Sequence, residues 1–427
     1  MPSSYLAAFI DEFATKEPVG IDPGKVLAGL CELPDPRKKG GIRYPFAHLL
    51  VIIVCSVLSG AKSLVEMAEW ATDTARVPLA GLGIRAPHAT TLARVLQRLD
   101  ADALDRLAGA WAQSMTEVTA IAIDGKEVRG AKNGGGTKVH LLAGIDQATG
   151  AVLVQQNVSA KHNEITYFKP LLEEIAAIDG MVVTADALHT QREHAQYLHF
   201  RGAHYVLTVK GNQPKLHEQL CALPWKQVRA GPKAHTTANG REIQRTVKCV
   251  TVAAGINFPH AAQGAQITRK SRPLGTRKWS TETVYVVTSL TPAQGKPELI
   301  GNLIHGHWGI ENGLHYRRDV TWREDSSQIR KDNAPRVVAS LRISLSRLCL
   351  WQANATTPKP PEPPQLPAPR TLTRWPRYQL NGLCNRPVQS GLAFLLRRSF
   401  NKKPSPTFTH VLIQLQQIFE SFNLITT

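Results

Sequence analysis

Two short apolar runs that each lead into an aspartate constrain the fold of this chain more than any other feature. The run at 118–123 ends at Asp124, and the run at 181–184 stops just before Asp186. Each run is typical of a buried strand. A third acid, Glu311, stands in a stretch with helical spacing. We therefore expect an α/β sheet that gathers three carboxylates at one rim, two from strands and one from a helix packed beside them.

Oxygen-rich clusters of this kind bind hard divalent cations such as Mg2+, and two such ions can hold both oxygens that exchange in a phosphoryl transfer. A simpler interpretation exists for each acid. Aspartates that follow strands often form turns or cap helices. Three further acids crowd the segment after Glu311, namely Asp319, Glu324 and Asp325.

The charge of the chain favours a polyanionic partner. Its 427 residues include 51 Lys and Arg against 33 Asp and Glu, which gives a formal net charge of +18. Nucleic acid is the commonest partner of such a protein. The longest apolar segment, 46–60, is too short to span a bilayer, and no basic leader opens the chain. The six cysteines are scattered, which favours reduced thiols. We expect a cytoplasmic, nucleoid-associated protein with no membrane contact.

The first part of the chain, 1–117, is predicted to be a helical domain. Apolar residues recur with helical spacing in four segments, Leu6–Phe13, Pro45–Ser59, Ser63–Thr72 and Thr90–Leu107. The last two could form a helix-turn-helix whose second helix enters a DNA groove. A plain helical packing unit explains the same pattern equally well.

The next part, 118–213, changes to a strand-rich pattern. Three apolar runs are joined by turns at 134–137 and 147–150, which indicates antiparallel hairpins. A helix at 164–178, the strand before Asp186, a helix at 191–200 and a strand at 204–209 follow. This order is typical of a ribonuclease H-like core, and we predict that fold class.

Three further regions complete the predicted organisation. Residues 214–292 show short alternating runs around basic residues, which indicates a strand-rich insertion into the core. Residues 293–350 return to helical spacing and carry Glu311 as the helical remainder of the core. Residues 351–427 form a proline-rich basic tail, atypical of the rest, and proline cannot continue a helix or a central strand.

Seven phrases stand in one order along the chain: IDGKEVRG, VHLLAGID, KHNEIT, TADALHTQ, YVLTVKGNQP, HWGIEN and DVTWRED. In this order they resemble the landmarks of bacterial insertion-sequence transposases of the DDE class, and within it the H-repeat-associated type. The resemblance runs from about Leu33 to about Arg342, and the tail lies beyond it.

The resemblance implies an enzyme that binds the terminal inverted repeats of its own mobile element, cuts DNA strands there and transfers the freed ends to target DNA. It implies that Asp124, Asp186 and Glu311 are the catalytic acids and hold Mg2+, for which Mn2+ can substitute. It also implies double-stranded DNA, both element ends and target, as the partner, and a homodimer in the synaptic complex.

Basic and polar residues near the three acids are candidate DNA contacts. We expect such contacts from Lys126, Arg129, Lys210, Asn212, Gln213 and Arg318. Arg318 stands seven residues after Glu311, two helical turns on, where the family has a basic residue. A surface turn is the alternative for Lys210.

Four other residues leave two interpretations open. His189 and Gln191 could position substrate or cap the next helix. Trp279 could stack on a flipped base or lie in the core. His305 stands where relatives commonly have arginine, which weakens the expected phosphate contact there.

Two alternatives to an active transposase remain at this stage. One is another ribonuclease H-like nuclease, which would share the acids but would not need the helical N-terminal region or the insertion. The other is a catalytically degenerate or domesticated DNA-binding protein, which the atypical tail would suit.

Overall fold

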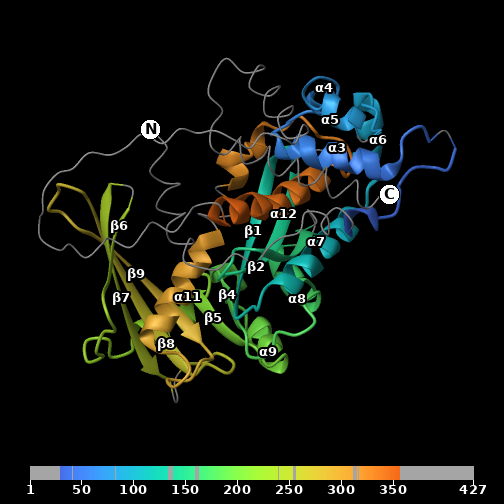
Figure 1. Cartoon of the computed structure of the whole chain (residues 1–427). Coiled ribbons are helices and arrows are strands. Elements are labelled where there is room, and N and C mark those ends of the chain that lie inside the picture. Colours follow the sequence, from blue (N-terminus) through green and yellow to red (C-terminus); the bar gives the residue numbers. More distant parts are fainter. Residues whose placement is uncertain are drawn as a thin grey trace, which may run out of the picture.

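The protein is a mixed α/β structure built around one large sheet, as seen in a computed structural model (Figure 1). The structure describes residues 29–40, 42–81, 83–132, 138–158, 163–238, 240–252, 256–310, 315 and 317–355. The helix expected at Leu6–Phe13, the turn at 134–137, Glu311 and the tail from 356 onward lie outside these residues.

The sheet has nine strands in the order β3-β2-β1-β4-β5-β9-β8-β7-β6. Their bounds are β1 Ala120–Lys132, β2 Lys138–Asp146, β3 Val152–Val158, β4 Val182–Ala185, β5 His204–Val209, β6 Ala234–Ala238, β7 Arg241–Thr251, β8 Gln263–Pro273 and β9 Ser280–Thr288. Strands β1 to β3 form antiparallel hairpins, and β4 and β5 run parallel to β1. The expected order of elements in 118–209 is therefore present.

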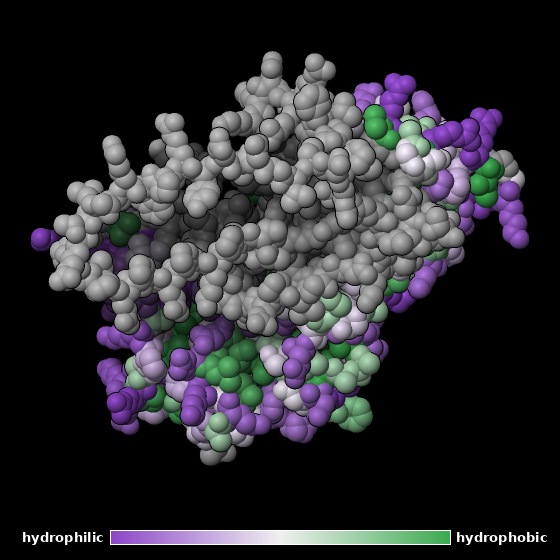
Figure 2. Space-filling model, viewed as in Figure 1, coloured by the Kyte–Doolittle hydropathy of each residue, from purple (hydrophilic) through white to green (hydrophobic). Residues whose placement is uncertain are grey.

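The insertion is continuous with this sheet. Strand β9 pairs antiparallel with β5, and β8, β7 and β6 follow outward as a meander. The region 214–292 contains these four strands, with one helix, α10 (Pro214–Cys221), before them. Hydrophilic side chains predominate along the edge where β7 and β8 lie (Figure 2).

The helices before the sheet are α3 Phe46–Leu58, α4 Leu64–Glu69, α5 Arg76–Gly81, α6 Ala89–Arg98 and α7 Ala101–Met115, with a π-helical turn at Trp70–Thr74. The single helix expected at Thr90–Leu107 is in fact two. Asp100 accepts hydrogen bonds from the backbone N–H groups of Asp102 and Ala103, at 2.9 and 3.0 Å, and so starts α7 with a new N-cap.

The two helices proposed as a helix-turn-helix do contact each other, since α4 packs on α6. However, α5 stands between them in the chain, so the connection is not the short turn of that motif. Plain helical packing describes this region.

The remaining helices are α8 Glu164–Glu173, α9 Arg192–Phe200, α11 Pro297–Gly309 and α12 Ala334–Ala355. The helix expected at 164–178 is shorter than predicted and ends at its C-cap, Glu174. None of the helices in the described residues is long and apolar enough to cross a membrane.

The N-terminal helices share a hydrophobic core with residues from the other end of the sequence. Ten consecutive residues of α3, from Leu49 to Leu58, are buried, and the cluster around them includes Trp322, Val337 and Leu341. Helices α3, α6 and α7 thus pack against α12, which also covers β1 (Figure 1).

Candidate active site

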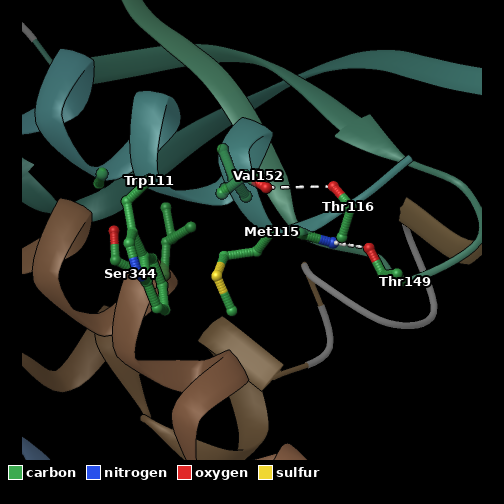
Figure 3. A pocket seen from close by; sticks show the side chains of 10 residues that line it. Trp111, Met115, Thr116, Thr149, Val152 and Ser344 are labelled. Atoms are coloured by element: carbon green, nitrogen blue, oxygen red, sulfur yellow. Dashed lines mark hydrogen bonds between the residues drawn. The ribbon is translucent and has the colours of Figure 1, made fainter. Parts of the chain in front are cut away.

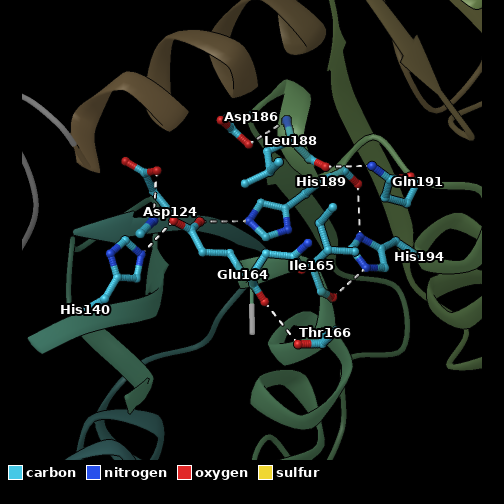
Figure 4. Close-up of polar contacts among 12 residues, drawn as sticks. Asp124, His140, Glu164, Ile165, Thr166, Asp186, Leu188, His189, Gln191 and His194 are labelled. Atoms are coloured by element: carbon cyan, nitrogen blue, oxygen red, sulfur yellow. Dashed lines mark hydrogen bonds and ion pairs between the residues drawn. The ribbon is translucent and has the colours of Figure 1, made fainter. Parts of the chain in front are cut away.

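The two aspartates lie side by side on neighbouring parallel strands, with Asp186 directly after the end of β4 and Asp124 within β1. The prediction that a strand ends at Asp124 is wrong, because β1 continues to Lys132 through its pairing with β2. In the register of β1 and β4, Ile123 is paired with Ala185, and Asp124 and Asp186 are the next residues of the two strands. Figure 4 shows both carboxylates at this rim. Asp124 Oδ1 accepts from the N–H of Gly125 at 2.8 Å, and its side chain is 20% exposed. The predicted gathering of these two acids at one rim is present.

Asp186 also has the structural role that the simpler interpretation suggested. It is the N-cap of a 3-10 turn, η2 (Ala187–His189), and its Oδ1 accepts from the N–H of Leu188 at 3.0 Å. This bond uses one carboxylate oxygen and fixes the direction of the side chain. Capping and a role in the site are compatible, because a carboxylate has two oxygens with several lone pairs.

Glu311 lies outside the described residues, but the chain on both sides of it is placed against β1. Before it, Ile310 is fully buried in a cluster with Ala122 of β1. After it, Nδ1 of His315 lies 3.7 Å from Oδ2 of Asp124. The segment that carries the third acid therefore begins and ends beside the strand of the first.

Helix α11, which leads to Glu311, is attached to β4 by buried polar contacts. Nδ1 of His307 lies 3.2 Å from Oγ1 of Thr184, and Gln147 donates to the same hydroxyl at 2.6 Å. Burial lowers the pKa of His307 to about 4, although the negative charge of Asp186 opposes the shift. His307 is thus neutral at pH 7 and fixes the helix without adding charge to the rim.

His315 is also held neutral. Burial, followed by the positive charges of Lys126 and Arg318, lowers its pKa to about 3, and the acids nearby only partly offset this. A neutral imidazole beside Asp124 adds no positive charge there, so the rim keeps the negative charge of its carboxylates.

A fourth carboxylate, Glu164, lies directly under this rim, and it was missed among the predicted site residues. Its Oε1 is 2.6 Å from Nε2 of His140, and its Oε2 is 3.4 Å from Nε2 of His189 (Figure 4). Burial raises its pKa, but the close contacts and charges of the two histidines outweigh burial and bring the pKa to about 2. The KHNEIT phrase, which contains Glu164, was the signal that could have identified it.

The residues predicted to contact DNA differ in how far their side chains are exposed to solvent. Lys210 is exposed, as a phosphate contact requires. Lys126 is mostly buried, with 13% of its side chain exposed, and its Nζ lies 2.6 Å from Oδ2 of Asp319. Arg129 lies in β1, and its side chain is not among the described ones.

The geometry of Arg318 does not fit a phosphate contact. Its side chain is 2% exposed and its Nε donates to Oε2 of Glu324, also buried, at 2.7 Å. The guanidinium in this arrangement belongs to an internal ion pair and does not reach the surface.

Asn212 and Gln213 bind the protein's own backbone. The side-chain amide of Asn212 donates to the carbonyl of Ala187 at 2.5 Å, and that of Gln213 donates to the carbonyl of Thr190 at 2.9 Å. Both amides thus attach the loop after β5 to the turn that follows Asp186. This geometry gives them a role in shaping the rim.

The residues with two open interpretations are placed as follows. His189 is fully buried, so it does not touch substrate directly. Gln191 donates to the carbonyl of Leu188 and makes no capping bond to α9. Trp279 is half-buried with the guanidinium of Arg272 at 4.5 Å from its ring centre, so it is not a core residue. His305 is half-buried in α11.

A separate apolar cavity of about 50 Å³ lies between α7, the start of β3 and α12 (Figure 3). Trp111, Met115, Val152 and Ile343 line it, and none of its lining residues is charged. Among the described residues, no group of three or more His, Cys, Asp or Glu is arranged to hold a metal, and Glu311 is not among them.

Comparison with known proteins supports the resemblance seen in the sequence. Residues 27–112 match a family described as DDE_Tnp_1-associated, and residues 117–345 match the family described as Transposase DDE domain. The chain is 28% identical to the putative transposase YncI of Escherichia coli O157:H7, over 76% of this chain and 87% of that protein. It is 25% identical to the H repeat-associated putative transposase YhhI of Escherichia coli K12, over 74% of this chain and 88% of that protein.

Among solved structures, a piggyBac transposase synaptic complex with hairpin DNA has a TM-score of 0.43 and 10% identity, over 99% of this chain and 81% of that chain. A similarity this low assigns no residue. The match to the DDE domain is different, because it covers more than half of the chain and includes Asp124, Asp186 and Glu311. The chain therefore belongs to the family of transposases with a DDE domain, and its relatives include the H repeat-associated type.

Proposed function

We propose that this protein is a metal-dependent DNA transposase that binds the terminal inverted repeats of an insertion sequence, cuts DNA strands at those ends and joins them to target DNA. Strands β1 to β5 would form a ribonuclease H-like core in this proposal. The observation that supports it best is the pairing of Ile123 with Ala185, which puts Asp124 and Asp186 next to each other where β4 ends beside β1.

The placement of the chain around Glu311 supports its role as the third acid. Ile310 is buried against β1 and His315 contacts Asp124, so only four residues separate these two anchored points. The sequence between these points contains one acid, Glu311, which is therefore the candidate for the third role. Asp319 is the weaker candidate for the third role, because it already pairs with Lys126.

The residues at the rim fit divalent metal ions. Asp124 and Asp186 supply carboxylate oxygens, the ligands that Mg2+ and Mn2+ prefer, and both side chains are partly exposed. Asp124, Asp186 and Glu311 would hold the ions, which supply activation of the attacking oxygen and stabilisation of the leaving oxygen. The protein itself orients the carboxylates, with the N–H of Leu188 fixing Asp186 and the N–H of Gly125 fixing Asp124.

The positive charge of the chain supports double-stranded DNA as the partner. The net charge of +18 favours phosphate binding, and Lys210 is exposed on the loop that leaves β5 beside the acids. Two element ends must be joined in one reaction, so we propose a homodimer in the complex with DNA.

The test is strand cleavage by Asp124→Asn, Asp186→Asn and Glu311→Gln proteins, on duplexes made from the DNA that flanks the coding sequence, in Mg2+ and in Mn2+. Each substitution is expected to abolish cleavage while gel-shift affinity is kept or improved, because removing a carboxylate charge reduces repulsion of DNA. Asp325→Asn, which changes an exposed acid in the same region, is the matched control and should cut normally.

Each outcome separates the proposal from its alternatives. If the unsubstituted protein binds the duplex without cutting it under any metal condition, the degenerate DNA-binding alternative is correct. If Glu311→Gln cuts normally, the third role passes to Asp319 or Glu324. Cleavage of branched DNA with no preference for the flanking repeats would favour another kind of nuclease.

A further inference from the structure

Glu164 connects the chain segments that carry the two aspartates. It is the first residue of α8, and its carboxylate lies between the backbone that follows Asp124 and the turn that follows Asp186. We propose that Glu164 is a positioning residue for the proposed reaction and that it sets the separation of Asp124 and Asp186. This inference rests on the proposed function, because it assumes that these two acids are catalytic.

The contact on the Asp124 side is made possible by a glycine. A Cβ atom added to Gly125 would lie only 2.3 Å from Oε1 and 2.6 Å from Oε2 of Glu164. No real side chain fits at that distance, so the carboxylate packs directly on the backbone of β1, one residue after Asp124. Any movement of the Glu164 carboxylate therefore alters the space beside Asp124 in this strand.

The contact on the Asp186 side is made through a buried histidine. His189 closes the 3-10 turn that Asp186 caps, and it is completely buried beside the rings of Phe168 and His194, with centroids at 5.3 and 5.8 Å. In the described part of the structure neither of its ring nitrogens has an aligned hydrogen-bond partner. Its Nε2 points to Glu164 Oε2 across 3.4 Å, so the glutamate is the polar group that this ring faces.

The third contact fixes the glutamate itself. His140 stands in β2 opposite Glu127 of β1, and its Nε2 lies 2.6 Å from Glu164 Oε1. The two oxygens of Glu164 are thus directed to two imidazoles, one on each side. A carboxylate engaged in this way is suited to hold its neighbours in place, whereas a metal ligand needs its oxygens directed to the ion. Groups that orient metal ligands from behind commonly affect metal affinity and rate by about 10–100-fold.

The experiment is a double-mutant cycle with Gly125→Ala and Glu164→Ala. The alanine at 125 displaces the Glu164 carboxylate, which is the end of a flexible side chain, so the fold can accommodate it. Each single substitution is expected to lower strand cleavage and the affinity for Mn2+, measured by calorimetry on the protein without DNA, by about 10–100-fold. The double variant is expected to be no worse than Glu164→Ala alone, because the displaced group is then absent.

Controls separate positioning from folding. Glu174→Ala removes another glutamate of the same helix, whose Oε1 accepts from Gln156 of β3, and it should leave cleavage and Mn2+ binding unchanged. Glu164→Gln keeps the size of the side chain and serves if the alanine variant does not fold. DNA affinity and melting temperature should remain close to those of the unsubstituted protein in the Gln variant, while Mn2+ binding falls.

Two results would overturn the inference. One is normal Mn2+ affinity and cleavage in a folded Glu164→Gln protein. The other is a fold-loss in the double variant that equals the product of the two single fold-losses. That result would mean that Gly125 and Glu164 act independently. If Asp124→Asn also keeps cleavage and Mn2+ binding, the proposed function itself has failed. If Asp124→Asn loses both while Glu164→Gln loses neither, only the role of Glu164 is refuted.

Discussion

Lys126 on strand β1 and Asp319 on the segment after Glu311 form an ion pair with 2.6 Å between Nζ and Oδ2, although 193 positions separate them in the chain. Lys126 is largely covered and Asp319 is 44% exposed, so the pair lies at the border between interior and solvent. It joins the segment of the proposed third acid to the strand of the first. The carboxylate of Asp319 therefore offsets the positive charge of Lys126, which was expected to contact DNA.

We predict that Asp319→Asn raises DNA affinity, because it releases the ammonium group of Lys126 for a phosphate. The slope of log affinity against log salt should become steeper by about 0.9, the value for one added phosphate contact. Gel shifts at several salt concentrations measure it. The effect should be smaller in a Lys126→Gln background, and Asp325→Asn should show only the general gain from one lost negative charge. An equal gain with and without Lys126 would contradict this prediction.

The buried pair of Arg318 and Glu324 predicts a large loss of stability and no specific loss of DNA binding. Glu324→Gln leaves a buried guanidinium without its counter-charge, which typically costs about 3–5 kcal/mol of unfolding free energy. Urea unfolding measures it, with Asp319→Asn as the control in a pair that lies partly in solvent and is expected to lose less stability. Replacing both members, in Arg318→Met/Glu324→Leu, should recover most of the loss. A folded Arg318→Met protein that keeps its stability but loses one unit of salt slope would restore the phosphate role.

The lowered pKa of His307 predicts that the folded protein loses stability in acid. Its pKa is lowered to about 4 in the folded protein by burial, against an ordinary value near 6.5. Between these values the unfolded chain binds more protons than the folded one, so stability is present above about pH 6.5 and falls as the pH drops toward 4. A shift of this size corresponds to a total on the order of 3 kcal/mol.

The measurement is urea unfolding at a series of pH values from 7 to 4.5. His307→Gln, which can keep a polar contact with Thr184, should lose less stability over this range than the unsubstituted protein. His199→Gln changes an exposed histidine and should leave the pH dependence as it was. Identical curves for all three proteins would show that His307 does not control the acid response.

The tail is predicted to be dispensable for the fold. Among the described side chains of α12, the buried core residues extend to Ile343, and the tail from 356 onward lies outside the described residues. A protein truncated after Ala355 should therefore keep the melting temperature and the cleavage activity of the full chain. Loss of a cooperative unfolding transition on truncation would show that residues beyond 355 pack on the enzyme.

The strands that carry the site could be predicted because their signal is local, although β1 continues past Asp124 to Lys132. Asp124 and Asp186 each follow an apolar run, and the alternation of runs and turns indicates the strands on which they stand. The joining of β5 to β9 depends on pairing between segments about eighty residues apart, which no local pattern contains. The sequence therefore indicated an insertion, whereas the structure shows one continuous sheet.

The surroundings of charged and polar side chains were the hardest feature to predict. Arg318 was predicted to lie at the surface, because arginine is rarely buried unless it is paired. No sequence pattern identified Glu324 as its partner. Asn212 and Gln213 stand at the expected rim, but their amides bond to backbone carbonyls of a different loop. Whether a polar group faces solvent or a neighbouring loop depends on tertiary packing, which spacing alone does not encode.

The shared core of α3 and α12 has a consequence for how the protein is made. The apolar helix Phe46–Leu58 leaves the ribosome long before Val337 and Leu341, the residues that cover it, have been synthesised. At about 5–20 residues per second, tens of seconds pass between the two events. During that time α4 and the turn at Trp70–Thr74 can already pack on α3, but the surface that α12 later covers stays exposed. We therefore expect that a chain whose synthesis stops before α12 leaves this apolar surface exposed and is prone to aggregation.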